Sequence, residues 1–103
     1  MVEFTDYAGL RIRLTDERLA HILDHPEMET LVSAIGETLT KPDCSVQSAS
    51  DEDARLYYRH ETTANLGEKY ICVVVKIHGD DAFVLTAYLT DHIKKGTLLW
   101  NRR

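Results

Sequence analysis

Three segments in the second half of the chain carry charged and hydroxyl side chains where a purely structural β-sheet would carry hydrophobic ones. They are Tyr57-Tyr58-Arg59, Val73-Val74-Val75-Lys76 and Thr86-Ala87-Tyr88. Side chains alternate between the two faces of a strand, so an arginine, a lysine and a Thr/Tyr pair in neighbouring strands can meet on one face. That combination is suited to binding a phosphate and transferring a proton.

Two histidines add candidate acid–base groups, because an unperturbed imidazole titrates near neutral pH. His21 and His25 are four residues apart in one predicted helix and therefore project from the same side of it. We expect acid–base groups rather than metal ligands, because a metal would need a third donor such as Asp24 or Glu27 and no zinc signature is present. The alternative for His25 is a structural role: Pro26 stops the helix, and the helix dipole favours a cation at its C-terminal end. No metal or other cofactor is expected.

Length and composition predict a single domain over residues 1–103. The net charge is −5, with four Lys/Arg against twelve Asp/Glu in residues 1–53 and eight against five in residues 54–103. This charge argues against tight non-specific binding to nucleic acid, although the second half can still present a positive surface. No hydrophobic run is long enough for a membrane helix, no signal peptide is visible, and two cysteines form no disulfide framework. We expect a cytoplasmic protein that does not contact a membrane.

Hydrophobic periodicity predicts a short strand, two helices and then a series of strands. Thr15 caps the first helix and Pro26 separates it from the second, which continues to about residue 39. The expected strands are 10–14, 44–48, 54–60, 70–78, 82–89 and 97–100, with a hairpin connection at 61–68, a solvated turn at 50–53 and a helical turn at 91–95. Because helices and strands are segregated, the predicted class is α+β, with two N-terminal helices packed on one face of a four- to five-stranded antiparallel sheet.

Strand periodicity also predicts which side chains face the helices. The inward set is expected to be Leu56, Tyr58, Ile71, Val73, Val75, Ile77, Phe83, Leu85, Ala87 and Leu89. The opposite face would then display Tyr57, Arg59, Lys76, Thr86, Tyr88 and Thr90, and it would be open because only one layer of helices is available. The alternative is an ordinary solvated face, on which cross-strand pairs stabilise by a few tenths of a kcal/mol. Lys94 and Lys95 either form a solvated turn or add two phosphate contacts.

The order and spacing of several motifs resemble the phage-associated barnase–EndoU–colicin–RelE-like nucleases. The matching segments are Leu14-Thr-Asp-Glu-Arg18, Ala20-His-Ile-Leu-Asp-His-Pro-Glu27, Leu39-Thr-Lys-Pro-Asp43, Tyr57-Tyr-Arg59, Val73-Val-Val-Lys76, Thr86-Ala-Tyr88 and Ile93-Lys-Lys-Gly96. The resemblance covers about residues 10–100. It implies a RelE/barnase-like fold and a metal-independent endoribonuclease, often a toxin, that has a cognate inhibitor or antitoxin protein.

The resemblance also implies roles for individual side chains. His21 would be a general acid or base, Arg59 and Lys76 would bind the scissile phosphate, and Thr86 and Tyr88 would hydrogen-bond it or relay a proton. The expected substrate-binding residues are His25, Tyr57, Thr90, Lys94 and Lys95. The ribose 2′-OH would attack its own phosphate and leave a cyclic phosphate. The acidic pI departs from strongly basic ribosome-dependent toxins. A non-catalytic module that binds an anion, RNA or a protein is one alternative, and a homodimer that buries the open face is another.

Overall fold

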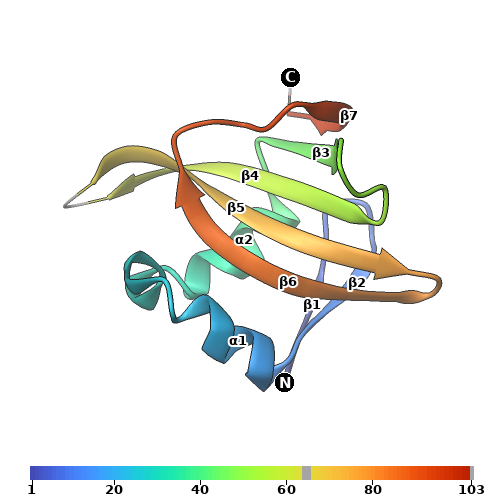
Figure 1. The fold of residues 1–103 in the computed structure, drawn as a ribbon, viewed down its shortest axis with the longest axis horizontal. Coiled ribbons are helices and arrows are strands. Elements are labelled where there is room, and N and C mark those ends of the chain that lie inside the picture. Colours follow the sequence, from blue (N-terminus) through green and yellow to red (C-terminus); the bar gives the residue numbers. More distant parts are fainter. Residues whose placement is uncertain (64–65, 103) are drawn as a thin grey trace.

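Seven strands form one sheet in the computed structural model, which describes residues 1–63 and 66–102. The strands are β1 (Val2–Thr5), β2 (Arg11–Leu14), β3 (Cys44–Ser48), β4 (Ala54–Thr63), β5 (Gly67–His78), β6 (Asp81–Thr90) and β7 (Gly96–Asn101). In space they follow the order β1-β2-β6-β5-β4-β3-β7 (Figure 1). Between β2 and β3 the chain forms α1 (Asp16–Ile22), the 3₁₀ helix η1 (Pro26–Thr30) and α2 (Ser33–Thr40).

The predicted RelE/barnase-like fold, a four- to five-stranded antiparallel sheet with two N-terminal helices, is wrong, because the described residues form a mixed sheet of seven strands. β2 runs parallel to β6, whereas the other neighbouring strands are antiparallel. One strand absent from the prediction is β1, which pairs with β2 from Val2↔Leu14 to Thr5↔Arg11. A four-residue segment contains too few alternations of polarity for its period to be recognised.

β2 joins the main sheet through a small contact. Its parallel pairing with β6 has one register pair, Arg13↔Phe83. There the Arg13 guanidinium donates hydrogen bonds of 3.0 and 2.7 Å to the carboxylate of Asp81. β2 therefore covers the beginning of β6 only, and α1 packs against β6.

The helical part of the chain is more broken than predicted. The hydroxyl of Thr15 accepts the N–H of Arg18 and caps α1, as the sequence suggests, but α1 ends at Ile22. His25 is extended, with φ −87° and ψ 107°, and it forms the N-cap of η1 rather than continuing α1. Pro26 explains the break, because the ring of a proline disfavours the helical conformation at the residue before it.

Hydrophobic clusters lie on both faces of the sheet. The cluster on the helix side contains Ile12, Leu14, Ile22, Met28, Ala34, Ile35, Leu39, Tyr57, Ile71, Val73, Val75, Ala82, Val84 and Ala87. The cluster on the other side, which we call the second face, contains Cys44, Val46, Ala54, Leu56, Tyr58, Cys72 and Val74. Residues 56–58 of β4 and 71–75 of β5 are therefore buried on both faces of the sheet, and the second face is not the fully open surface that the sequence predicts.

The predicted faces of β4 are reversed in the structure. Tyr57 lies in the helix-side cluster, whereas Leu56 and Tyr58 lie on the second face. Two adjacent tyrosines leave the alternation ambiguous, and a shift of one residue exchanges every side chain between the faces. Arg59 shares the parity of Tyr57 and therefore lies on the helix side, away from the second face.

A β-bulge changes the predicted faces of β6. Val75 pairs with Val84, but Val74 pairs with Thr86, so Leu85 is the additional residue. The bulge turns Val84 toward the helices and Leu85 toward the second face. The expectation that Phe83 and Leu85 would face the helices is therefore wrong, while Ala87 does face them.

After β6 the chain crosses the second face to reach β7 at the opposite edge of the sheet (Figure 1). We call residues 91–95 the crossover; they contain bends instead of the predicted helical turn. β7 pairs with β3 from Ser48↔Gly96 to Cys44↔Asn101. A Cβ atom on Gly96 would lie 2.2 Å from the carbonyl oxygen of Gln47, so this close approach requires glycine.

Two further expectations concern the ends of elements and the membrane. The connection predicted at 61–68 is shorter, since β4 extends to Thr63 and β5 begins at Gly67; residues 64–65 lie outside the described part of the chain. Among the described helices, none has the length and hydrophobicity needed to cross a membrane.

Candidate functional site

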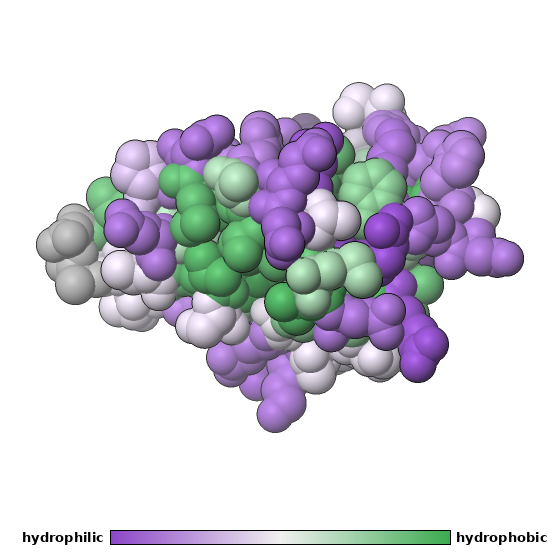
Figure 2. Space-filling view, turned by 90° about the horizontal axis from the view of Figure 1, so that it is seen from below, coloured by the Kyte–Doolittle hydropathy of each residue, from purple (hydrophilic) through white to green (hydrophobic). Residues whose placement is uncertain are grey.

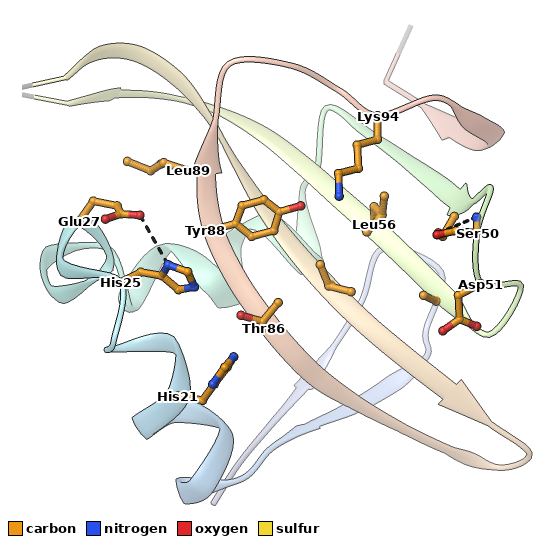
Figure 3. A pocket seen from close by; sticks show the side chains of 13 residues that line it. His21, His25, Glu27, Ser50, Asp51, Leu56, Thr86, Tyr88, Leu89 and Lys94 are labelled. Carbon is orange, nitrogen blue, oxygen red and sulfur yellow. Dashed lines mark hydrogen bonds and ion pairs between the residues drawn. The ribbon is translucent and has the colours of Figure 1, made fainter.

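A cleft of about 730 Å³ lies on the second face, between the sheet and the segment that links α1 to η1 (Figure 3). Its lining combines two imidazoles, several hydroxyls, one ammonium group and two carboxylates. The residues are His21, His25, Glu27, Ser48, Ser50, Asp51, Ala54, Leu56, Val74, Thr86, Tyr88, Leu89 and Lys94.

The two histidines come from the helical segment at one side of the cleft. His21 is exposed in the last turn of α1, and His25 is partly buried where η1 begins. Their ring centroids are 6.4 Å apart and the ring planes are nearly perpendicular, at 84°. The Nδ1 atom of His25 lies 3.9 Å from Oε1 of Glu27, which is an ion-pair distance. Two imidazoles at this spacing can both reach the oxygens of one phosphodiester.

Thr86 and Tyr88 project into the cleft from β6, opposite the histidines (Figure 3). The ring of Tyr88 lies 6.4 Å from that of His25. Burial, and then the neighbouring Cys72, raises the pKa of the Tyr88 hydroxyl above its ordinary value. Tyr88 is therefore a neutral hydrogen-bond donor at physiological pH and does not act as a base.

The hydroxyl of Thr86 has no hydrogen-bond partner among the residues that the structure describes, although its oxygen is buried. A buried polar atom without a partner costs about 1–3 kcal/mol. Such atoms are rare in folded proteins and require an explanation. Thr86 lines the cleft, so a rotation of its side chain would bring the hydroxyl within reach of a bound ligand.

Lys94 enters the cleft from the crossover. Its backbone N–H donates a 3.0 Å hydrogen bond to the hydroxyl of Tyr58 on β4. Its ammonium group points from the crossover toward the cleft (Figure 3). The only Lys or Arg among the described lining residues is therefore held by a hydrogen bond to the floor of the second face.

Ser50 and Asp51 lie at the far end of the cleft, in the connection between β3 and β4. The carboxylate of Asp51 accepts a hydrogen bond from the ammonium group of Lys76. This contact lowers the pKa of Asp51 and raises the pKa of Lys76 from their ordinary values. The two charges neutralise each other. Asp51 lines the cleft, whereas Lys76 binds to it from outside and is not a lining residue.

The structure divides the predicted site residues into two groups. His21, His25, Thr86, Tyr88 and Lys94 line the cleft together, whereas Arg59, Lys76, Tyr57, Thr90 and Lys95 do not. Arg59 lies on the helix side, where it donates 2.6 Å to the carbonyl oxygen of Lys41 and 2.9 Å to Oε1 of Glu37. The prediction that Arg59 and Lys76 lie on one face is wrong, because the alternation of side chains along β4 is the reverse of the predicted one and turns Arg59 toward the helices.

Tyr57 does not line the cleft and instead forms a buried hydrogen bond that stabilises the fold. Its hydroxyl donates a 2.6 Å hydrogen bond to Oδ2 of Asp6, a carboxylate in the turn between β1 and β2. Burial, and then Asp6, raises the pKa of Tyr57. The other oxygen of Asp6 accepts the N–H groups of Ala8 and Leu10, so this network ties the turn to the sheet.

Sequence reasoning missed two polar parts of the cleft. The sequence suggests Glu27 only as a third metal donor, although it directly follows the proline after His25. The sequence predicts a solvated turn at Ser50 and Asp51, because four consecutive polar residues give no indication that a cleft lies beside them. Within residues 1–63 and 66–102, no group of three or more His, Cys, Asp or Glu side chains is arranged to hold a metal ion.

Comparison with models of protein families, with curated proteins and with solved structures found no match to this chain.

Proposed function

We propose that this protein is a small metal-independent endoribonuclease whose reaction takes place in the cleft. The observation that carries the proposal is the meeting of two imidazoles, an ammonium group and neutral hydroxyls around one cleft. The buried Thr86 hydroxyl, which has no partner among the described residues, supports it, because after rotation of the side chain a phosphate oxygen would accept its proton. The family resemblance points to the same activity.

In the proposed reaction, RNA supplies its own nucleophile. One imidazole removes the proton of a ribose 2′-OH, and the 2′ oxygen forms a bond to the adjacent phosphorus. The bond from phosphorus to the 5′ oxygen of the next nucleotide breaks, and the second imidazole donates a proton to that oxygen. The products are a 2′,3′-cyclic phosphate and a free 5′-OH. His21 and His25 take these two roles, and the 6.4 Å between their rings suits a phosphate held between them.

Lys94, Tyr88 and Thr86 would stabilise the negative charge that grows on the phosphate oxygens. Tyr88 contributes as a donor, since its raised pKa keeps the hydroxyl protonated. Oε1 of Glu27 lies 3.9 Å from Nδ1 of His25, so an imidazolium at this position would have an anion beside it. On this geometry we assign His25 as the proton donor and His21 as the base.

The acidic character of the protein limits how RNA is held. Glu27 and Asp51 line the cleft beside Lys94, and the whole chain carries a net charge of −5. Few phosphates can therefore be neutralised, and we expect weak binding with a shallow dependence on salt. The same observation favours the second candidate, a non-catalytic module that binds an anion, RNA or a protein through this cleft.

Incubation of the purified protein with RNA in excess chelator separates these functions. The nuclease predicts cyclic-phosphate and 5′-OH ends, and His21→Ala and His25→Ala should each lose about a hundredfold or more of the rate. His78→Ala is the matched control, because His78 is exposed at the end of β5 and outside the cleft. Intact RNA, or equal rates in all three variants, would reject the nuclease; saturable binding of intact RNA would support the binding module.

RNA is the partner that this proposal requires. The family resemblance adds a toxin-like role with a cognate inhibitor protein, and a homodimer is the alternative use of the exposed surface. Sedimentation at high protein concentration distinguishes the monomer from the dimer.

A further inference from the structure

A second pocket of about 500 Å³ adjoins the cleft, and its chemistry differs from that of the cleft. It lies between η1 and the end of the β4–β5 hairpin. Its lining residues are Pro26, Glu27, Thr30, Leu31, Thr62, Thr63, Leu66 and Leu89. Figure 2 shows hydrophobic side chains gathered on one face of the molecule.

The two pockets form a continuous surface. Glu27 and Leu89 line both of them, and both residues lie at the end of the cleft beside His25 (Figure 3). When the phosphate of a ligand lies between the histidines, the part of the ligand next to that phosphate can therefore enter the second pocket along the protein surface.

The second pocket is unsuited to a phosphate. None of its described lining residues is Lys, Arg or His, and the carboxylate of Glu27 repels an anion. Its walls are apolar at Pro26, Leu31, Leu66 and Leu89, and the Glu27 carboxylate supplies a hydrogen-bond acceptor. The Thr63 hydroxyl is already engaged within the hairpin, where it donates to the carbonyl oxygen of Gly67 and accepts the N–H of Leu66. Flat apolar faces with N–H groups along one edge describe a nucleobase, and the volume is within the range of small-molecule sites.

We propose that the second pocket binds the base of the nucleotide next to the scissile phosphate. This inference rests on the proposed function, and it adds that the substrate is single-stranded over the two nucleotides that flank the cleaved bond. Bases paired in a duplex present neither their faces nor their edges to such a pocket.

Uncleavable ligands test the base pocket separately from catalysis. A deoxydinucleotide cannot be cleaved because it lacks the attacking 2′-OH. Two further ligands keep its phosphate, but each has an abasic residue in place of one of the two bases. We expect one abasic ligand to bind about tenfold more weakly than the complete dinucleotide. In NMR titrations it should no longer shift the methyl signals of Leu66 and Leu89, but it should still shift the ring signals of His21 and His25.

Two leucine variants provide a matched pair. Leu66→Ala should weaken binding of the complete dinucleotide about fivefold and leave binding of that abasic ligand unchanged. Leu98→Ala is the control, because Leu98 is 57% exposed, similar to the 51% of Leu66, but lies on β7 outside both pockets. Equal affinities for the three ligands, or equal effects of the two variants, would overturn the base pocket while RNA cleavage stands. Intact RNA together with unshifted histidine signals would overturn the nuclease and the base pocket together.

Discussion

The backbone N–H of Lys94 donates a hydrogen bond to the hydroxyl of Tyr58, a residue with no exposed surface on the central strand β4. The contact joins the crossover to the floor of the second face and fixes where the lysine side chain begins. Tyr58 is therefore a positioning residue for Lys94, although it does not line the cleft.

Replacement of this hydroxyl should affect RNA binding more than chemistry. We expect Tyr58→Phe to raise KM several-fold with little change in kcat, and to lower the free energy of unfolding by about 1 kcal/mol. Hydrogen exchange should show a faster-exchanging Lys94 amide. Tyr70→Phe, on the same face, is the control; an unchanged Lys94 amide in Tyr58→Phe would contradict the positioning role.

Thr86→Val should change stability and activity in opposite directions. The substitution preserves the shape of the side chain and removes the buried hydroxyl that has no partner among the described residues. We expect the free energy of unfolding to rise by about 1 kcal/mol while the cleavage rate falls. Urea unfolding and single-turnover kinetics measure the two effects, and a parallel loss of both would indicate a structural role instead.

Arg59→Ala should destabilise the protein without reducing its activity. The guanidinium connects β4 to the end of α2 through Glu37 and the carbonyl oxygen of Lys41. Loss of these charged hydrogen bonds on a partly exposed side chain should cost about 1–2 kcal/mol. The value of kcat/KM, measured well below the unfolding temperature, should stay within about twofold; a hundredfold loss would return Arg59 to the active site.

Alkaline pH should destabilise the fold through a buried thiol. Burial raises the pKa of Cys72 from 9.0 to about 11, so the folded state keeps a proton that the unfolded state releases. The contribution of the protonated Cys72 thiol to the free energy of unfolding is complete below pH 9 and is lost as the pH rises to about 11. Urea unfolding between pH 8 and ~11 should show this loss, and Cys72→Ala should reduce it; identical pH profiles would exclude the thiol as the cause.

The hairpin of β5 and β6 could be predicted from sequence because two hydrophobic runs, the first of them rich in Ile and Val, meet at a tight turn beside Gly79. The face assignments failed where the local pattern is degenerate. Tyr57 and Tyr58 are equally suitable for either face, and the bulge at Leu85 arises from pairing with β5, which no single strand encodes.

The residues of the cleft could likewise be predicted only in part from the sequence. His21, Thr86 and Tyr88 could be selected by residue type and parity, and the structure places them around one cleft. Arg59 could not be excluded in advance, since its partners Glu37 and Lys41 approach from α2. Tertiary contacts of this kind decide whether a cation is free to bind a ligand.

The pairing of β7 with β3 also determines when the cleft is completed during synthesis. Ser48 pairs with Gly96, so the crossover that carries Lys94 is fixed only after a contact distant in sequence has formed. A nascent chain therefore cannot anchor Lys94 from both sides until residues 96–101 have left the ribosome and paired with β3. If the proposed cleavage of RNA depends on Lys94, full activity is delayed until β7 has joined the sheet.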